Sequence, residues 1–83
     1  MTTPLLLQAK SPTKSSWVDC RGSTKIVFSG RSPEDVFLVF TRRGDLIQRI
    51  PVDGANEVLV PARADKVRVL FATGPSTVDV DLE

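Results

Sequence analysis

The sequence predicts an all-β fold, a small antiparallel sandwich of two sheets with an N-terminal arm. Apolar and polar residues alternate with a period of two, most clearly from Thr77 to Glu83, where Val78, Val80 and Leu82 share one face. Residues typical of turns recur at intervals of roughly 8–12 residues, as they do in sandwiches and barrels. Eleven of the 83 residues are valine, whose branched side chain suits a pleated surface.

We expect six or seven strands, drawn from eight segments with strand composition. In chain order the segments are Leu5–Ala9, Trp17–Cys20, Thr24–Ser29, Val36–Thr41, Asp45–Ile50, Glu57–Val60, Lys66–Ala72 and Thr77–Leu82. The connections between them are short and rich in Gly, Pro, Ser and Asp, which favours antiparallel pairing. Two facing sheets would cover the apolar side of each strand, in an Ig-like or jelly-roll-like arrangement.

The start of the chain differs from the rest. We predict an N-terminal arm and linker over residues 1–15 and a sandwich domain over residues 16–83, because Lys10–Ser16 is polar and has the composition of a flexible linker. Leu5, Leu6 and Leu7 precede this linker. They could form an edge strand of the same domain, or dock on a neighbouring chain and add a strand to its sheet.

Composition excludes most catalytic chemistry. The chain has no His, no Tyr and one Cys, so acid–base schemes that use His, Cys–His nucleophiles, metal sites of Cys and His, and internal disulfides are all excluded. We therefore expect a protein that is not an enzyme and has no cofactor or metal. Cys20 is interpreted as a reduced thiol that fills a strand position.

Charge is balanced overall but uneven along the chain. Eleven basic residues meet ten acidic ones, and the basic residues in the middle of the chain are interpreted as solvated, so we expect no direct nucleic-acid binding. Residues 1–33 carry a net charge of +4, and residues 73–83 carry −3. Two arrangements would bring these opposite charges together: the terminal strands lie near each other in one chain, or copies meet head to tail in a homo-oligomer. No segment is apolar enough to enter a membrane or serve as a signal peptide, so we expect synthesis and folding in a cytoplasm.

Several apolar residues exceed what a sandwich core needs. Val36–Phe40 is apolar on both faces, and placing Val36, Leu38 and Phe40 in the core leaves Phe37 and Val39 on the outer face. Exposed apolar patches usually mark contact surfaces. The predicted partner-binding residues are Leu5, Leu6, Leu7, Val27, Phe37, Val39 and Leu59. The alternative is that another part of the chain covers them.

Three further residues are candidates for ligand contact. Trp17 is the only Trp, and it either anchors the core or stacks on a sugar ring. Arg43 and Asp45 flank Gly44 at the expected tip of a hairpin, where an Arg-Gly-Asp sequence can serve adhesion or simply form a turn.

A resemblance between parts of this sequence and a known group of proteins narrows the range of functions that we expect. The stretches that carry it are Gly22–Gly30, Val36–Phe40 before a Gly-Asp turn, Val67–Val69 and Thr77–Leu82. From Trp17 to Glu83 the chain resembles small β-sandwich domains of tailed-bacteriophage virion proteins, including capsid decoration (cement) proteins and modules of head or tail fibres. The resemblance implies a structural protein located in the virion, which binds capsid or tail proteins and stabilises the particle. The alternative is an Ig-like module for ligand binding or adhesion that recognises a glycan or a cell surface.

Overall fold

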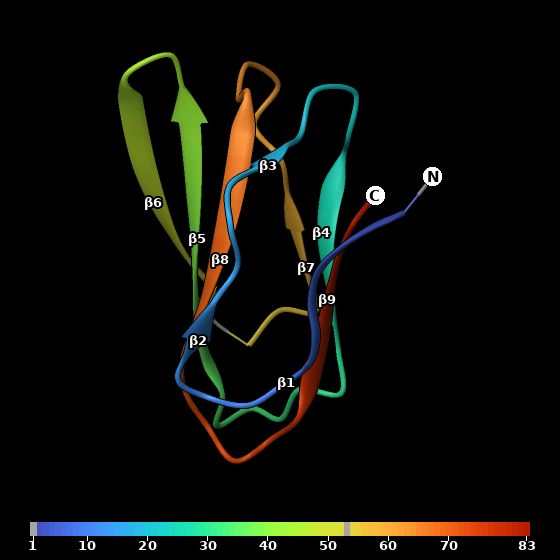
Figure 1. Ribbon diagram of the computed structural model, residues 1–83. Coiled ribbons are helices and arrows are strands. Elements are labelled where there is room, and N and C mark those ends of the chain that lie inside the picture. The colour runs from blue at the N-terminus through green and yellow to red at the C-terminus, as the bar shows by residue number, and fades with distance from the viewer. Residues whose placement is uncertain (1, 53) are drawn as a thin grey trace.

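The computed structural model describes residues 2–52 and 54–83, which form two antiparallel sheets and contain no helix. The smaller sheet consists, in order, of β1 (Thr3–Ala9), β9 (Val78–Leu82), β4 (Lys25–Ser29) and β7 (Glu57–Leu59). The larger sheet consists of β2 (Thr13–Lys14), β8 (Lys66–Thr73), β5 (Val36–Arg43) and β6 (Leu46–Val52), with β3 (Val18–Asp19) also paired to β8. The two sheets form two layers (Figure 1), which confirms the predicted all-β sandwich.

The strands agree closely with the sequence pattern. Each of the eight predicted segments contains one strand, and the ends differ by at most two residues. The expected number of six or seven strands is too low, because the described residues form nine, and the ninth strand, β2, lies in the segment predicted to be a linker. The described part of the chain holds no helix of a length and hydropathy suited to crossing a bilayer.

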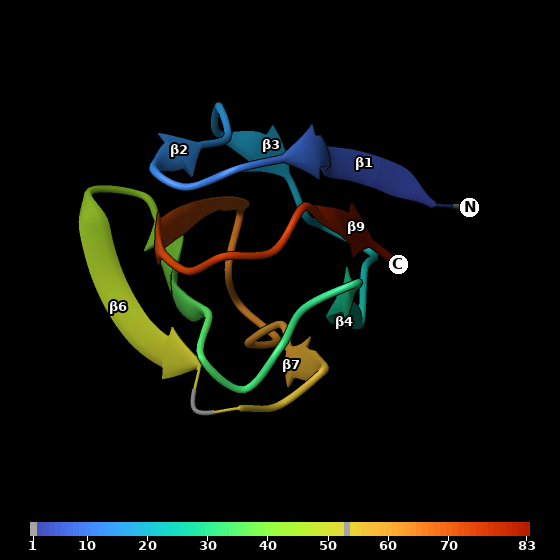
Figure 2. The same cartoon turned by 90° about the horizontal axis from the view of Figure 1, so that it is seen from below.

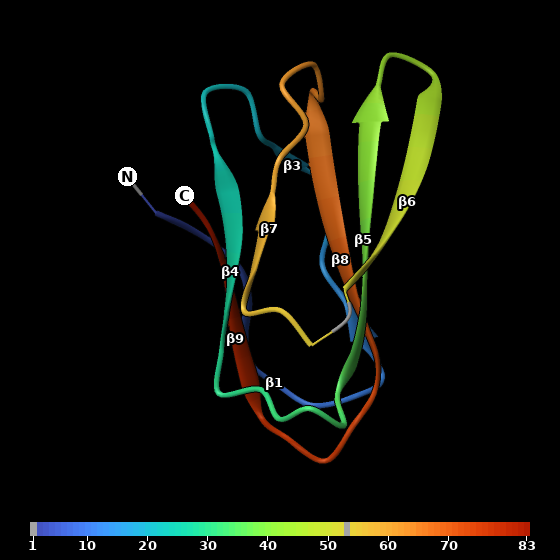
Figure 3. The same ribbon diagram turned by 180° about the vertical axis from the view of Figure 1, so that it is seen from behind.

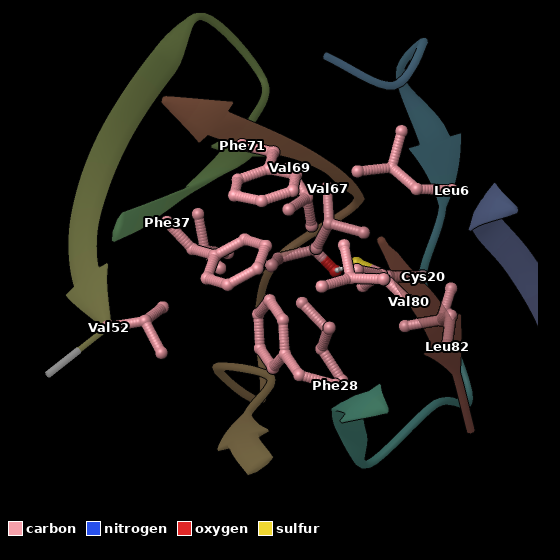
Figure 4. Close-up of a cluster of buried hydrophobic side chains, with 14 residues drawn as sticks. Leu6, Cys20, Phe28, Phe37, Val52, Val67, Val69, Phe71, Val80 and Leu82 are labelled. Atoms are coloured by element: carbon pink, nitrogen blue, oxygen red, sulfur yellow. Dashed lines mark hydrogen bonds between the residues drawn. The ribbon is translucent and has the colours of Figure 1, made fainter. Parts of the chain in front are cut away.

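The core lies between the sheets and is built by strict alternation. Val78, Val80 and Leu82 point inward from β9, as predicted, and each is at most 1% exposed. Figure 4 shows the side chains of both sheets meeting in one cluster. The centre is aromatic, because the Phe37 ring lies 4.6 Å from that of Phe71 and 4.8 Å from that of Phe28, between ring centroids. Such close aromatic pairs add to the stabilisation from apolar burial.

The prediction that Phe37 and Val39 face outward is wrong. Phe37 is 1% exposed and Val39 is fully buried. Residues directly opposite each other in an antiparallel pair share a face, and Phe37 lies opposite the inward Phe71 of β8. The alternate residues of β5 therefore face outward, although they are as apolar as the buried ones.

The N-terminal segment belongs to the sandwich. β1 pairs with β9, and Leu6 is 8% exposed within the core, so the leucines pair within their own chain. Thr13 and Lys14 then pair with Phe71 and Leu70 of β8 in the other sheet. Figure 2 shows this segment running along one side of the molecule, from the smaller sheet to the larger. The expected separation of residues 1–15 as an arm and linker is thus corrected, because both sheets use this segment as an edge.

Three loops gather at one end of the sandwich, called here the loop end. They are the β3–β4 loop, the β5–β6 hairpin and the β7–β8 loop (Figure 3). Asp65 ties them together: its amide donates to the Arg42 carbonyl at 2.7 Å, its carbonyl accepts from the Cys20 amide at 2.9 Å, and its carboxylate accepts from the Gly44 amide at 3.1 Å.

Candidate functional site

The outer face of the larger sheet, turned away from the core, carries an apolar area that spans three strands. Its members are Val36, Leu38 and Phe40 of β5, Leu70 and Ala72 of β8, and Ile47 and Pro51 of β6. Leu38 lies opposite Leu70 on one side and Pro51 on the other, so the area is continuous across the strands. Val36 and Ile47 remain 47% and 55% exposed. Contiguous exposed apolar area of this kind usually marks a contact surface.

The same outer face is also basic. Five cationic side chains lie on it: Lys14 of β2, Arg42 of β5, Arg49 of β6, and Lys66 and Arg68 of β8. They are far apart in the sequence and meet because β8 and β6 pair with the two sides of β5. We call this surface, with its apolar area, the basic face.

Among the residues that the structure describes, one acidic side chain lies on the basic face. Asp19 of β3 is opposite Lys66, and its carboxylate binds the Arg21 guanidinium at 2.7 Å. The hydrogen bonds from Arg21 lower the pKa of Asp19 to about 2, so this carboxylate is charged at neutral pH. Since Arg21 accompanies it, Asp19 leaves the positive character of the face in place.

Trp17 lies over this face and contacts its arginines. The Cζ atoms of Arg68 and Arg42 lie 5.0 Å and 5.8 Å from the centre of the indole ring, within the range of cation–π attraction. Arg68 is further enclosed, because its Nε is buried and has no hydrogen-bond partner among the described residues. Trp17 is half-buried. It is therefore a surface anchor that orders two guanidinium groups, and the ring is partly covered where a sugar would stack.

The residues predicted to bind partners are placed in different environments. Leu5 packs half-buried against the core, Leu6 lies within it, and Leu7 is 69% exposed. Leu6 therefore joins Phe37 and Val39 as a buried residue that a partner cannot reach in the folded chain. Val27 and Leu59 lie on the outer face of the smaller sheet, as predicted, and Leu59 is 77% exposed. The predicted set is thus not one surface.

The loop end contains a pocket beside the Arg-Gly-Asp sequence. Arg43 and Leu46 pair across a two-residue turn of Gly44 and Asp45, and Gly44 has a φ of +57°, which suits the first central position of a tight hairpin turn. This confirms the predicted hairpin tip. A pocket of about 270 Å³ opens beside it, lined by Thr41, Arg43, Leu46, Gln48, Pro61, Ala62, Arg63 and Ala64. Its lining is amphipathic, with the basic groups at the rim exposed.

Cys20 has a structural setting. It is 1% exposed, its thiol donates to the Ala64 carbonyl at 3.4 Å, and burial raises its pKa above the ordinary value. A thiol held protonated in this way is a poor nucleophile. Within residues 2–52 and 54–83, no three potential metal-ligating side chains lie close enough to hold an ion.

The sequence-based prediction missed the basic face for two reasons. It placed the wrong set of β5 residues in the core, and it interpreted the basic residues in the middle of the chain, among them Arg42, Arg49, Lys66 and Arg68, as solvated. The alternation Lys66-Val67-Arg68-Val69 did place both cations of β8 outward, which was the available signal. The order of the strands, which brings β8 beside β5, was not available. Comparison of the chain with models of protein families, with curated proteins and with solved structures gave no match.

Proposed function

We propose that this protein is a non-enzymatic binding module that docks on another protein through its basic face. The observation that carries the proposal is the continuous outer face of the larger sheet, where exposed apolar residues lie among five cations. Apolar area supplies the gain from excluding water, and the cations add selectivity and faster encounter with an acidic partner. Trp and Arg are also the residue types that most often dominate binding energy at interfaces.

The Trp17 arrangement supports docking because it is already ordered. The indole holds the guanidinium groups of Arg42 and Arg68 at 5.8 Å and 5.0 Å before any partner arrives. Long cationic side chains otherwise lose rotamer freedom on binding, at a cost of about 0.5–1.5 kcal/mol each. Fixing them in advance lowers that cost.

A narrower form of the proposal comes from the resemblance noted for Trp17–Glu83. In that form the partner is a capsid or tail protein of a bacteriophage virion, and the module stabilises the particle. The support for it is the pattern of the sequence together with a rigid two-layer fold that could add contact area to a lattice. Mass spectrometry of purified particles would test it, since a virion protein must be present in them in a fixed ratio to the main capsid or tail subunit.

Site-specific photocrosslinking tests the docking face. A photoreactive amino acid replaces Ile47 on the basic face, and in a matched variant it replaces Glu34 in the loop between β4 and β5. Both positions are exposed, so neither replacement disturbs the core. We expect a defined crosslinked partner from position 47 and none from position 34. The same partner from both positions, or from position 34 alone, would contradict the proposal.

Adhesion through the hairpin tip is a second candidate, favoured by one observation. Arg43, Gly44 and Asp45 are all exposed at the end of a two-residue turn. An integrin ligand presents these two charges from a Gly turn, as here. Cell attachment to immobilised protein, compared with an Asp45→Asn variant, tests this candidate, and attachment unchanged by the substitution would remove it.

A further inference from the structure

We propose that copies of this chain stack on one another, with the basic face of one copy against the outer face of the smaller sheet of the next. This inference rests on the proposed function and names a second copy as the partner. It is carried by the charge of the two outer faces, which is opposite in sign. The sequence showed only that the two ends of the chain differ in charge.

The outer face of the smaller sheet is acidic. Its charged side chains are Asp79 and Asp81 of β9, Glu57 of β7, Glu83 next to β9, and Lys25 of β4. The strand register brings them together, because Val27 of β4 lies opposite Asp81 on one side and Glu57 on the other. Lys25, the only cation in the set, binds Glu57 at 3.0 Å. We call this surface the acidic face.

The acidic face also offers apolar contact. Val27 is half-buried at its centre, and Leu59 beside it is 77% exposed. These residues match the apolar area of the basic face, so two copies could exclude water as well as pair charges. That matters because exposed ion pairs alone contribute little to association.

The geometry of the two faces makes the contact open-ended. The sheets are the two layers of a sandwich, so their outer faces point in opposite directions (Figure 2). A copy that uses its basic face therefore keeps its acidic face available, and the contact is head to tail. Such contacts extend into a row unless a rotation closes them into a ring. A net charge of +1 leaves little long-range repulsion between copies.

A polyanion is the other occupant that the basic face could take. Single strands of nucleic acid bind where aromatic rings offer platforms for base stacking. The Trp17 ring here faces two guanidinium groups, and the apolar side chains Leu38 and Leu70 would gain nothing from phosphate. The second copy satisfies both the charge and the apolar area, and it is the occupant we propose.

Charge reversal on each face tests the stack by sedimentation velocity. Arg49→Glu alters the basic face and leaves the acidic face intact, whereas Asp81→Lys does the reverse. We expect the unmodified protein to show an average mass that keeps rising between about 10 µM and about 1 mM, with each variant associating at least about tenfold more weakly. Association should also weaken when sodium chloride rises from about 50 mM to about 500 mM, because salt screens exposed charges.

Mixing the two variants gives the sharpest result. The Asp81→Lys variant retains a working basic face and the Arg49→Glu variant a working acidic face, so together they should form a heterodimer that cannot grow further. Arg63→Glu and Glu34→Lys make the same charge changes at exposed positions outside both faces, and they should stack like the unmodified protein. Circular dichroism melts of all variants check that each is folded.

Several results would overturn the stack. They are a monomer at every concentration, a closed dimer whose mass reaches a plateau, equal weakening by the control substitutions, or no complex in the mixture. Binding to a poly-dT oligonucleotide that Arg49→Glu abolishes, in a protein that does not self-associate, would assign the basic face to nucleic acid. If the protein is a monomer but still gives a defined crosslinked partner from position 47, the proposed stacking of copies is wrong and the proposed docking on another protein is retained.

Discussion

The assignment of β5 can be tested by making one substitution on each of its faces. We predict that Phe37→Leu destabilises the protein by about 2–4 kcal/mol, because it leaves a cavity and loses two aromatic pairs worth about 0.5–1.5 kcal/mol each. The ring contacts are those at 4.6 Å to Phe71 and 4.8 Å to Phe28. Phe40→Leu is the same chemical change on the outer face, where the side chain is only half-buried, and it should cost less than about 1 kcal/mol.

Urea unfolding provides the measurement, with Trp17 fluorescence and far-UV circular dichroism as independent probes. A domain of this length has a free energy of unfolding on the order of 4–12 kcal/mol, so the Phe37→Leu variant should stay folded in water while its midpoint falls clearly. Equal losses for the two variants, or a larger loss for Phe40→Leu, would refute the assignment of Phe37 to the core and of Phe40 to the basic face.

Three further predictions concern the interior. Gly74→Ala should lower the free energy of unfolding by about 1–3 kcal/mol, as measured in thermal melts, because the added Cβ would lie 2.8 Å from the Asp35 Cα at a φ of +145°. In Gly22→Ala the added Cβ meets open space, so this substitution should cost only the strain of the positive φ, about 1–2 kcal/mol. Burial raises the pKa of Asp35, but hydrogen bonds from Ser32 and Ser76 outweigh this effect and leave the pKa below its ordinary value. The ionised carboxylate therefore contributes stability above about pH 4, and this contribution is lost as the pH falls through the pKa of Asp35 in the folded protein. In urea titrations, the difference in free energy of unfolding between the unmodified protein and Asp35→Asn should shrink at low pH. Cys20 should react with a thiol reagent at least about 100-fold more slowly in the native protein than in denaturant, and equal rates would contradict its burial.

The fold was largely predictable because the strands carry local signals. Alternation, apolar runs and the turn residues between them located every strand but β2, and turn residues located the hairpin at Gly44. β2 has two residues and a polar composition, and it forms only because β8 offers an unpaired edge that Thr13 and Lys14 can reach. A pairing created by a distant strand has no local signature.

The candidate site was less predictable, for a physical reason that β5 illustrates. Val36, Leu38 and Phe40 are as apolar as Phe37 and Val39, so alternation alone cannot decide which set is buried. The tie is broken by the register with β8, where inward Phe71 lies opposite Phe37. That register depends on pairing between residues far apart in the sequence. When it is predicted wrongly, the residues assigned to the core and those assigned to the surface change places.

The charge of the two faces follows from the same register that builds the core. In β9 the apolar residues Val78, Val80 and Leu82 must be buried, and with a period of two this forces Asp79 and Asp81 outward. In β8 the burial of Val67 and Val69 forces Lys66 and Arg68 outward on the other layer. A slip of one residue in either strand would bury charges and expose the core, at a cost of several kcal/mol per ion. The opposite charges of the faces are therefore held in place by the hydrophobic packing, and substitutions that leave the core intact can change the sign of a face without changing the fold.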